Sequence, residues 1–510
     1  MKVNADKKSR QEIYKTLNIT KTTDMDKVPV VNCCCLKNSD WNIKVPFRLD
    51  ITSFEGIKSE IVCTEVIRIL PAKRLVCYGI WQKKNVVAKI FLNSCKAKKN
   101  SCREAKGINE LADAGIKTPA IFFKGNLEKK TYILIFEKIE HASGLGTIIK
   151  KTKNAASIIF FLNKAVSVIA DQHNAGLKQD DIHPDNFLVT ENDIYTIDGS
   201  TIDTKNRQTA LSVSKSINNL GLFFAQFNLQ NFETIDEIFR FYLKKRNWPF
   251  QKILLNKLIN EIKKQQHIRK KKFVKKSFRE CTSLVCRKNM HFFMVCDRNN
   301  YDKEMICFLD NPDMLIDQSI ILKKGNSSTV ALVNIGNRKL VVKRYNMKNM
   351  WHAIKRLPRK SRAWISWQNA HLLSFWKILT PKPVAFMEKR FGPFRSTAYF
   401  ISEYVEGKDA CTILHSDKLK NAVANNIADQ FAKLFQSLSN VSISHGDFKA
   451  KNFISNSKGL FVIDLDNMHE HLFKWSLKKA LKRDKDRFMK NWHNLPDTFF
   501  RFDEKIQNIK

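Results

Sequence analysis

The chain has 510 residues, 43% of them hydrophobic, which is enough for roughly two to four domains with cores of their own. Its formal net charge is +40, from 89 Lys and Arg against 49 Asp and Glu. This charge favours an anionic partner, such as a membrane surface or a phosphorylated substrate, whereas nucleic-acid binding lacks any recognisable motif. There is no uncharged run of about 18 apolar residues and no signal-peptide pattern at the N-terminus, so we expect a cytoplasmic protein.

The twelve cysteines include the consecutive Cys33, Cys34 and Cys35 and a loose series from Cys281 to Cys307. Neither group contains the C-x2-C pair that structural zinc sites usually have. We therefore expect reduced thiols and keep zinc binding as the alternative.

Residues 1 to about 55 are polar and mixed, which predicts an N-terminal extension. Residues 60–138 predict strands with one helix, and the segment VVAKIF places Lys89 on a β-branched strand. A lysine in this position is either an exposed side chain on the wet face of a strand or a group that reaches the phosphates of a nucleotide.

The predicted helix after this strand ends at Gly115 and carries two acidic residues, Glu104 and Glu110. Either carboxylate is placed to pair with Lys89, and Glu104 is the preferred partner. Glu137 follows at the end of a later predicted strand, where a hinge between two lobes is expected.

The most informative stretch is QDDIHPDNFLVTENDIYTID, residues 179–198. Here Asp181 is followed five residues later by Asn186, and twelve residues after that by Asp198. Alternating apolar residues between the Asn and the second Asp predict a small hairpin that brings the two acids together. The segment HGDFKAKNFISNSKGLFVID repeats this spacing 266 residues later, with Asp447, Asn452 and Asp464.

Each triplet suits phosphoryl transfer from ATP. This reaction needs a carboxylate that orients the attacking hydroxyl and oxygen ligands that hold Mg²⁺ on the phosphates. We assign the first role to Asp181 and Asp447. The metal ligands are the Asn and the second Asp of each triplet: Asn186, Asp198, Asn452 and Asp464. One D-x4-N motif is a weak signal, but two copies with the same third residue are a strong one.

Helical apolar stripes at residues 156–173 and 423–438 predict a helix before each triplet. His173 lies on the first stripe, so a place in the core explains it better than a role as a catalytic base.

The second half repeats the order of elements. Gly325 lies in a polar turn between predicted strands, where backbone N–H groups can approach a phosphate. The strand VVKRY supplies Lys343 as the counterpart of Lys89. Glu403 follows Glu137 at the same offset of 266 residues, at a second expected hinge.

One group is missing from the second half. No Asp or Glu lies between Lys343 and Glu388, so the helix after the lysine offers no acidic partner. Ser366 or Trp367 stands near the expected position. A lysine without this partner is expected to swing away from the phosphates.

Segments rich in basic and aromatic residues surround Trp351 to Trp367 and Trp475 to Trp492. We expect them to contact an anionic membrane surface. A third basic run, residues 262–279, is better explained as a solvated helix and linker.

The sequence resembles the lipopolysaccharide-core (Kdo and heptose) kinases of the protein-kinase-like superfamily, in two tandem units. The resemblance rests on VVAKIF, REAKGINELADAGIKTP and D-x4-N…IDG in the first half. In the second half it rests on GNSSTV, VVKRYN, SRAWISW, HGDFKAKN, IDLD and RDKDRF. It departs from the family pattern at Gln179, which replaces the usual His two residues before Asp181, and in the glycine-rich loop, which is not recognisable beyond Gly79.

The resemblance implies an α+β fold of two kinase-like units, each with a strand-rich N-terminal lobe and a helical C-terminal lobe. The expected domains are an extension at 1–55, unit 1 at 56–285 and unit 2 at 286–510. It also implies ATP and Mg²⁺ as cofactors and a sugar hydroxyl of a lipid-linked bacterial glycan as acceptor. The expected location is then the inner face of the inner membrane.

Two alternatives remain open: a non-catalytic kinase-like scaffold and a protein Ser/Thr kinase, because the fold alone does not set the acceptor. The complete set of charged groups in the first half favours that half as the catalytic one.

Overall fold

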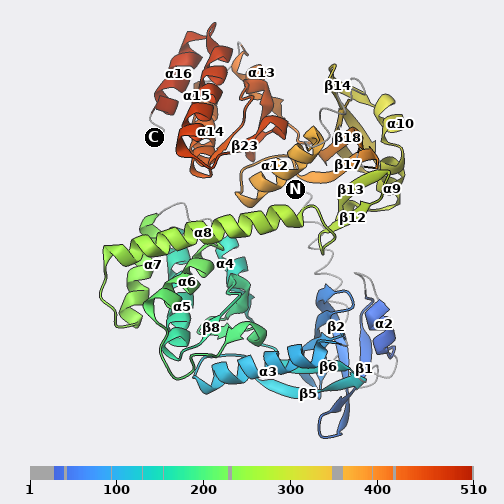
Figure 1. The fold of residues 1–510 in the computed structure, drawn as a ribbon, viewed down its shortest axis with the longest axis vertical. Helices are drawn as coiled ribbons and strands as arrows, with labels where there is room; N and C mark the ends of the chain where they lie inside the picture. The colour runs from blue at the N-terminus through green and yellow to red at the C-terminus, as the bar shows by residue number, and fades with distance from the viewer. Residues whose placement is uncertain are drawn as a thin grey trace. The chain divides into compact units, whose positions relative to one another are not determined.

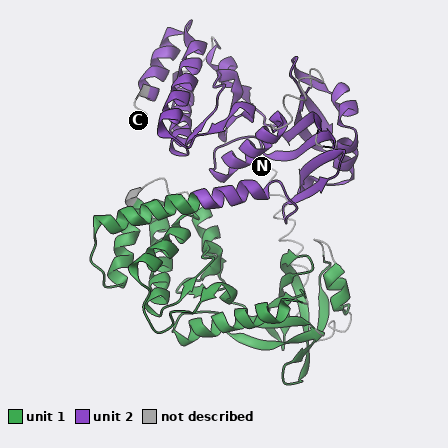
Figure 2. Ribbon diagram, viewed as in Figure 1, with its two compact units in different colours: residues 1–266 green, residues 267–510 purple. Residues whose placement is uncertain are grey.

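The computed structural model describes residues 28–38, 43–93, 95–128, 130–152, 154–227, 232–346, 360–392, 394–416 and 421–507. The chain divides into two compact units, residues 1–266 and 267–510 (Figure 2). This boundary falls within one long helix, α8 (Lys252–Lys276), and not near residue 285 as the sequence suggested. The reason is that the end of α8 packs on unit 2, where the Phe273 and Phe375 rings lie 5.5 Å apart.

The strand-rich N-terminal lobe of each unit is called its upper lobe, and the helical C-terminal lobe its lower lobe. In unit 1 the upper lobe, drawn at the lower right of Figure 1, is a closed antiparallel barrel in the order β1-β2-β3-β4-β6-β5. Its strands are β1 (Phe47–Ser53), β2 (Lys58–Leu70), β3 (Arg74–Trp81), β4 (Lys84–Phe91), β5 (Ile121–Glu128) and β6 (Thr131–Glu137). β1 closes the barrel by pairing with both β2 and β5. Its alternate residues Phe47, Leu49 and Ile51 are buried in the barrel core. This strand is therefore part of unit 1, whereas the sequence predicted an extension up to residue 55.

Helix α3 (Ala97–Asp113) packs on β4 and β6, and the chain turns at Gly115 with φ of 72°, as the sequence predicted. The lower lobe is helical, with α4 (Leu145–Lys151), α5 (Ala155–Asn174), α6 (Val213–Phe224), α7 (Phe232–Lys245) and the first part of α8. Between these helices lie the short strands β7 (Ser143–Gly144), β8 (Lys178–Gln179), β9 (Phe187–Val189), β10 (Ile194–Thr196) and β11 (Ile202–Asp203).

Within the described residues, α5 alone is long and apolar enough to cross a membrane by length and composition. From the sequence, which has no uncharged apolar run of about 18 residues, we expected no membrane-spanning helix. Its Leu162, Val166 and Ile169 are buried in the core of the lower lobe, and the polar Gln172 and His173 are also fully buried. These contacts explain the apolar composition of α5 as that of a core helix.

The upper lobe of unit 2 is an antiparallel sheet in the order β12-β13-β17-β18-β16-β15-β14. Its strands are β12 (Leu284–Lys288), β13 (Phe292–Asp297), β14 (Ile320–Lys324), β15 (Ser328–Ile335), β16 (Arg338–Tyr345), β17 (Pro383–Phe391) and β18 (Phe394–Glu403). The helices of this lobe are α9 (Lys303–Asp310), α10 (Pro312–Asp317) and α12 (Arg362–Phe375). The sheet is open, with β12 and β14 at its edges.

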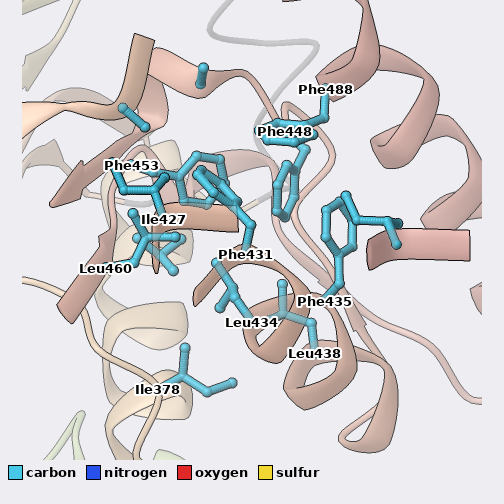
Figure 3. Close-up of a cluster of buried hydrophobic side chains, with 14 of the residues drawn as sticks. Ile378, Ile427, Phe431, Leu434, Phe435, Leu438, Phe448, Phe453, Leu460 and Phe488 are labelled. Atoms are coloured by element: carbon cyan, nitrogen blue, oxygen red, sulfur yellow. The ribbon is translucent and has the colours of Figure 1, made fainter. Parts of the chain in front are cut away.

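The lower lobe of unit 2 contains α13 (Ala410–Leu414), α14 (Asn421–Asn440), α15 (Lys474–Met489) and α16 (Pro496–Gln507). Its short strands are β19 (Lys408–Asp409), β20 (Ile443–Ser444), β21 (Phe453–Asn456), β22 (Gly459–Val462) and β23 (His469–Glu470). The predicted stripe of α14 packs its Phe431 against Phe448, Phe453 and Phe488 in the core (Figure 3). This core fixes the segment that follows α14, which carries the second triplet.

The aromatic residues that the sequence assigned to a membrane surface divide into two groups. Trp367 and Trp492 are fully buried, and Trp364 stacks on Phe278 at 4.1 Å, so these three belong to the core. Trp351 lies outside the described residues. Trp475 is 71% exposed and remains available for an external contact.

Candidate active site

Each predicted triplet lies on a short 3₁₀ turn followed by a hairpin. In unit 1, Asn186 Nδ2 donates to the backbone oxygen of Asp181 at 3.0 Å, and β9 pairs with β10 just before Asp198. In unit 2, Asn452 Nδ2 donates to the backbone oxygen of Asp447 at 2.8 Å, and β21 pairs with β22 before Asp464. The hairpin predicted from the alternating pattern is present in both units.

Asp198 and Asp464 share an unusual backbone conformation. Their φ values are 70° and 61°, in the left-handed region that non-glycine residues seldom adopt. Such strain costs about 1–3 kcal/mol, persists only where the surroundings enforce it and concentrates at functional sites. Its recurrence at the same motif position marks both aspartates as candidate site residues.

In unit 1, Lys89 on β4 forms an ion pair with Glu104 of α3, and its Nζ lies 3.8 Å from Asp198 Oδ1. The other candidate partner, Glu110, pairs instead with Arg207. Burial of Asp198 would raise its pKa, but the positive charge of Lys89 lowers it below its usual value.

Two glycines allow α3 to approach the loop after Asp198. A Cβ on Gly107 would lie 1.9 Å from the backbone oxygen of Gly199, so neither position has room for a side chain. This approach lets the buried Glu104 accept from the backbone N–H of Ser200 at 3.2 Å while it holds Lys89.

In unit 2, Lys343 on β16 forms an ion pair with Asp464, and its Nζ lies 3.2 Å from Asp466 Oδ2. Asp466 has no exposed side-chain surface, and Arg362 at the start of α12 lies 2.7 Å from the same oxygen. Ser366 of α12 lines the cavity with Lys343, as Glu104 does with Lys89. The lysine therefore does not swing away, contrary to the expectation from the sequence.

The second carboxylate has changed elements between the units. Unit 1 has Glu104 on its helix and Ser200 two residues after Asp198, whereas unit 2 has Ser366 on its helix and Asp466 two residues after Asp464. In each unit the lysine contacts two carboxylates. In unit 2, Asp466 on the loop thus takes the place of the acidic residue that α12 does not have.

The charges of this cluster shift its pKa values in the direction expected for an ion pair. Burial alone would lower the pKa of Lys343, but Tyr345, Asp466 and Asp464 raise it above its usual value. Burial alone would raise the pKa of Asp464, but the Lys343 ammonium lowers it. Both groups are therefore charged at neutral pH.

His445 lies two residues before Asp447 and is fully buried. Its Nδ1 accepts from the Asp447 backbone N–H at 3.3 Å, so Nε2 carries the proton and donates to the Ile463 oxygen at 3.0 Å. Burial lowers the pKa of His445, which keeps it neutral. In unit 1, Gln179 Nε2 donates to the Ile197 oxygen at 3.1 Å, while its buried Oε1 has no hydrogen-bond partner. The glutamine therefore reproduces the contact made by Nε2.

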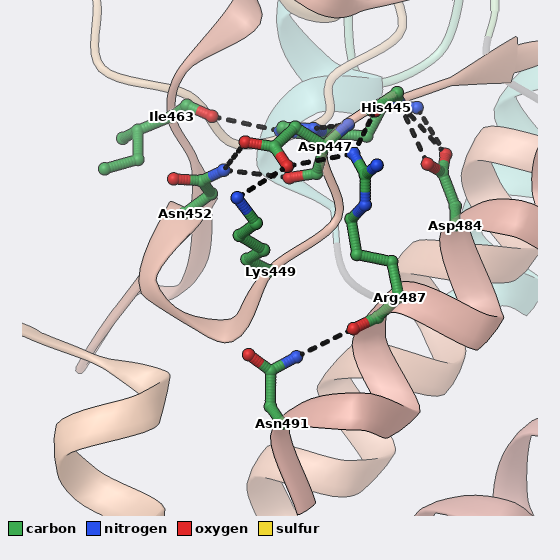
Figure 4. Close-up of polar contacts among 9 residues, drawn as sticks. His445, Asp447, Lys449, Asn452, Ile463, Asp484, Arg487 and Asn491 are labelled. Carbon is green, nitrogen blue, oxygen red and sulfur yellow. Dashed lines mark hydrogen bonds and ion pairs between the residues drawn. The ribbon is translucent and has the colours of Figure 1, made fainter.

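Two side chains of helix α15 bind the backbone before Asp447 (Figure 4). Asp484 accepts from the N–H of His445 at 2.7 Å and from that of Gly446 at 3.0 Å. One turn later, Arg487 donates to the Gly446 oxygen at 2.7 Å and to Asp447 Oδ1 at 3.0 Å. Gly446 has φ of 78°, and a Cβ there would lie 2.3 Å from the backbone oxygen of Asn467.

The corresponding positions of unit 1, which the structure describes, do not carry such a pair. The positions 266 residues before Asp484 and Arg487 are Asn218 and Gly221. Neither has a charged side chain that could bind the loop before Asp181. Asn219 Nδ2 instead donates to the backbone oxygen of Gln179 at 2.7 Å.

His173 belongs to the core, as the sequence predicted. It is fully buried, accepts from the Tyr242 hydroxyl at 2.8 Å and donates to Asn219 Oδ1 at 3.0 Å. Burial lowers the pKa of His173 to about 3.

The predicted hinge and turn residues lie at the ends of strands. Glu137 ends β6 and accepts from the Ala120 N–H at 3.2 Å, and Glu403 ends β18 with its Oε1 3.5 Å from Lys382 Nζ. Gly325 lies in the turn between β14 and β15, where its N–H donates to the Ser328 oxygen at 3.1 Å.

The cavities beside the two lysines differ greatly in size. The cavity in unit 2 has a volume of about 710 Å³ and is lined by every residue predicted for that unit: Gly325, Lys343, Glu403, Asp447, Asn452 and Asp464. The cavity in unit 1 has about 100 Å³. It is lined by Lys89, Glu104, Glu137 and Asp198, but not by Asp181 or Asn186.

All twelve cysteines lie in the described part of the chain and none forms a disulfide. Among the described residues, no group of three or more His, Cys, Asp or Glu side chains could hold a metal ion. The zinc alternative therefore finds no site within these residues.

Four charged residues of the unit 2 site received no role from the sequence. Asp466 lies in IDLD, and Asp484 and Arg487 lie in RDKDRF, so the motifs were visible although the contacts were not. Arg362 carried no signal of its own, because its partner lies 104 positions away in the chain.

A family model described as "Lipopolysaccharide kinase (Kdo/WaaP) family" matches residues 79–223 and 317–499, one segment in each unit. The fold and the repeated site thus define two tandem protein-kinase-like units of α+β class, as the sequence predicted. Because the matched segments cover more than half of its residues, the chain belongs to the lipopolysaccharide kinase (Kdo/WaaP) family. This family supports a kinase-type phosphotransferase.

No curated protein sequence matches the chain. Among solved structures it is similar to the Mycobacterium tuberculosis PknI kinase domain, with 11% identity and a TM-score of 0.23 over 28% of this chain and 58% of that one. A point mutant of that domain matches with 10% identity and a TM-score of 0.22, over 28% of this chain and 59% of the other. The chain thus spans less than two thirds of the length of either domain.

Proposed function

We propose that this chain is an ATP-dependent phosphotransferase whose second unit carries out the reaction on a sugar hydroxyl of lipopolysaccharide core or a related lipid-linked glycan. The observation that carries the proposal is the cavity of about 710 Å³ that unites Lys343, Asp447, Asn452 and Asp464. Sites for small molecules and cofactors usually span about 300–1,000 Å³. The volume and the donor set together suit a nucleotide with an acceptor beside it.

Each residue of the unit 2 site would have a separate role in the reaction. ATP supplies the phosphoryl group, and Mg²⁺ offsets the negative charge of its phosphates when bound. The carboxylate of Asp464 and the amide oxygen of Asn452 are hard oxygen donors of the kind that Mg²⁺ prefers. Lys343 would contact the phosphates together with backbone N–H groups of the turn at Gly325. Asp447 would orient the acceptor hydroxyl and take its proton.

The hinge of unit 2 suits the nucleobase. Glu403, Tyr404 and Val405 line the cavity, and the Tyr404 N–H donates to the Lys339 oxygen at 3.1 Å. This bond fixes the backbone against which a base would lie. Phe400 and Ile463 supply apolar lining to the same cavity.

An exposed apolar tip lies between β23 and the start of α15. Leu472, Phe473 and Trp475 are 83%, 61% and 71% exposed, and the last two rings stack at 6.2 Å. The tip is tied to the segment before the triplet, because Ser444 Oγ and His471 Nε2 lie 2.8 Å apart. With Lys474 beside it, the tip suits an anionic membrane surface. Peripheral binding at the cytoplasmic face of a bacterial inner membrane is therefore part of the proposal.

The test is transfer of label from γ-labelled ATP to lipopolysaccharide and other envelope glycan extracts. Asp447→Asn should lower the rate by about 100-fold or more, because it removes the base that orients the hydroxyl. Asp181→Asn is the matched variant in unit 1 and should leave transfer intact. Folding of both variants is checked by circular dichroism.

Other outcomes would change the assignment. Loss of transfer in Asp181→Asn alone would move the reaction to unit 1. Transfer only to protein Ser or Thr would replace the sugar acceptor. The absence of both transfer and ATP hydrolysis in the wild-type chain would favour the scaffold.

A further inference from the structure

Unit 1 has the charged groups of a kinase-like site but little space beside them. Its cavity of about 100 Å³ compares with about 710 Å³ in unit 2. The smaller value lies below the range of about 300–1,000 Å³ that is usual for ligand sites. The pairing of the strands shows which positions of the two units correspond, and so which side chains take up the space in unit 1.

The first difference is in the residue that pairs with a valine of the lysine strand. This valine lies two residues before Lys89 in unit 1 and two residues before Lys343 in unit 2. In unit 1, Val87 pairs with Phe136 on β6, whereas in unit 2 Val341 pairs with Ser402 on β18. All four residues line the cavity of their own unit. Phe136 and Ser402 are therefore equivalent positions, and unit 1 has an aromatic ring where unit 2 has a hydroxymethyl group.

Phe136 is held in place. It is 4% exposed and packs in one cluster with Ala105 and Ile108 of α3. Lys89 Nζ also lies 5.3 Å from the ring centroid, within the range of a cation–π contact. Movement of the ring out of the cavity would therefore break its contacts with α3 and with Lys89.

A second aromatic residue narrows the same cavity. Tyr78 of β3 lies opposite Val87, where unit 2 has Leu332 opposite Val341. Lys138 just after β6 lies over the Tyr78 ring at 5.3 Å and donates to Glu140 at 3.1 Å.

The chain after β6 is also tied back to the upper lobe. Glu140 accepts from Asn85 Nδ2 at 3.1 Å, and Asn85 lies on β4. This contact and the Lys138–Tyr78 contact fix the hinge segment beside the ring that fills the cavity.

We propose that unit 1 is a kinase-like unit closed to nucleotides by its own side chains, and that Phe136 determines this specificity. The chain then binds one nucleotide, in unit 2. The ion pair of Lys89 with Glu104 serves to hold α3 against the barrel and the loop after Asp198. The inference rests on the proposed function in one respect, that unit 2 takes ATP.

The direct test is the stoichiometry of binding of the non-hydrolysable analogue AMP-PNP with Mg²⁺ to the full chain, measured by isothermal titration calorimetry. The expected value is one per chain. A value of two overturns the inference while the proposed function stands. A value of zero overturns the proposed function, on which the inference depends.

Exchanging the two equivalent residues makes the test specific. Ser402→Phe should bring the stoichiometry from one to zero, because it places a ring in the cavity of unit 2. Phe136→Ser, combined with Tyr78→Leu, should raise it from one to two. Retention of one nucleotide by Ser402→Phe and its loss in Lys89→Ala would show that unit 1 is the binding unit and would overturn the inference.

Removal of a buried ring can unfold unit 1, so a measurement on the wild-type chain is included. AMP-PNP should slow hydrogen–deuterium exchange at least fivefold in peptides that contain β16, and leave exchange in peptides that contain β4 unchanged. Equal protection of both strands would contradict closure of unit 1.

Discussion

The strand lysine of each unit pairs with a second carboxylate, and we predict that this carboxylate can lie either on the loop after the triplet or on the helix after the lysine. In unit 2, Asp466→Ser removes it from the loop, and Ser366→Glu places one on α12, which reproduces the arrangement of unit 1. At 3.2 Å from Lys343 Nζ and an effective dielectric constant of about 20, the gross attraction is about 5 kcal/mol. Removing one partner of a buried pair costs about 3–5 kcal/mol.

We expect Asp466→Ser to lower the free energy of unfolding of unit 2 by about 3 kcal/mol, at the low end of that range. Lys343 keeps Asp464, and Arg362 is 30% exposed and can reach water, so the loss is partly relieved. Ser366→Glu alone should also destabilise, because it adds a buried charge. The double variant should recover about 1–3 kcal/mol relative to the sum of the single variants.

The assay is urea unfolding of the full chain, followed by hydrogen exchange of peptides from each unit. ATP-dependent transfer by the same variants should fall and recover in parallel. The reciprocal pair in unit 1, Glu104→Ser with Ser200→Asp, is the control and should leave transfer unchanged. If the double variant in unit 2 is no more stable than the sum of the single changes predicts, the two carboxylates are not equivalent and the reasoning is refuted.

Three further predictions follow from single contacts. Arg487→Ala should lower kcat about 10- to 100-fold with little change in the KM for ATP, because it loosens Asp447; a changed KM alone would contradict this role. The pKa of His173 is about 3 in the folded chain and about 6.5 in the unfolded chain. As pH falls from 6.5 towards 3, the unfolded chain therefore binds a proton that the folded chain does not, and the free energy of unfolding of unit 1 should decrease. His173→Gln should flatten that dependence in urea unfolding at pH 7 to 4. Trp475→Ala should reduce co-sedimentation with anionic vesicles severalfold, whereas equal wild-type binding to neutral vesicles would exclude electrostatic attraction.

The sequence predicted those parts of the site that local pattern encodes. The constant spacing of the triplets fixed the short turn and the hairpin, since alternating apolar residues before Asp198 and Asp464 specify a strand pair. The candidate pairing of Lys89 with Glu104 followed from the order of strand and helix. These features depend on residues near one another in sequence or on a repeated spacing.

Features that depend on distant packing were not predictable in this way. The acid that supports Lys343 was sought on the following helix, but Asp466 approaches from a loop 123 positions away. The barrel closure by β1 required partners in two strands, β2 and β5, which the polar composition of the N-terminal residues did not indicate. The small cavity of unit 1 depends on where the Phe136 ring points, which a strand pattern cannot specify.

A full set of charged residues does not by itself distinguish the two units. In both units the strand lysine contacts two carboxylates, so ionic satisfaction does not distinguish them. Two other features do, and they are independent of one another. The loop at Asp447 is gripped by Arg487 and Asp484, and the adjoining cavity is large enough for a nucleotide. Phosphoryl transfer needs both a well-positioned base for the acceptor hydroxyl and enough space for the nucleotide. For this reason we propose unit 2 as the active unit.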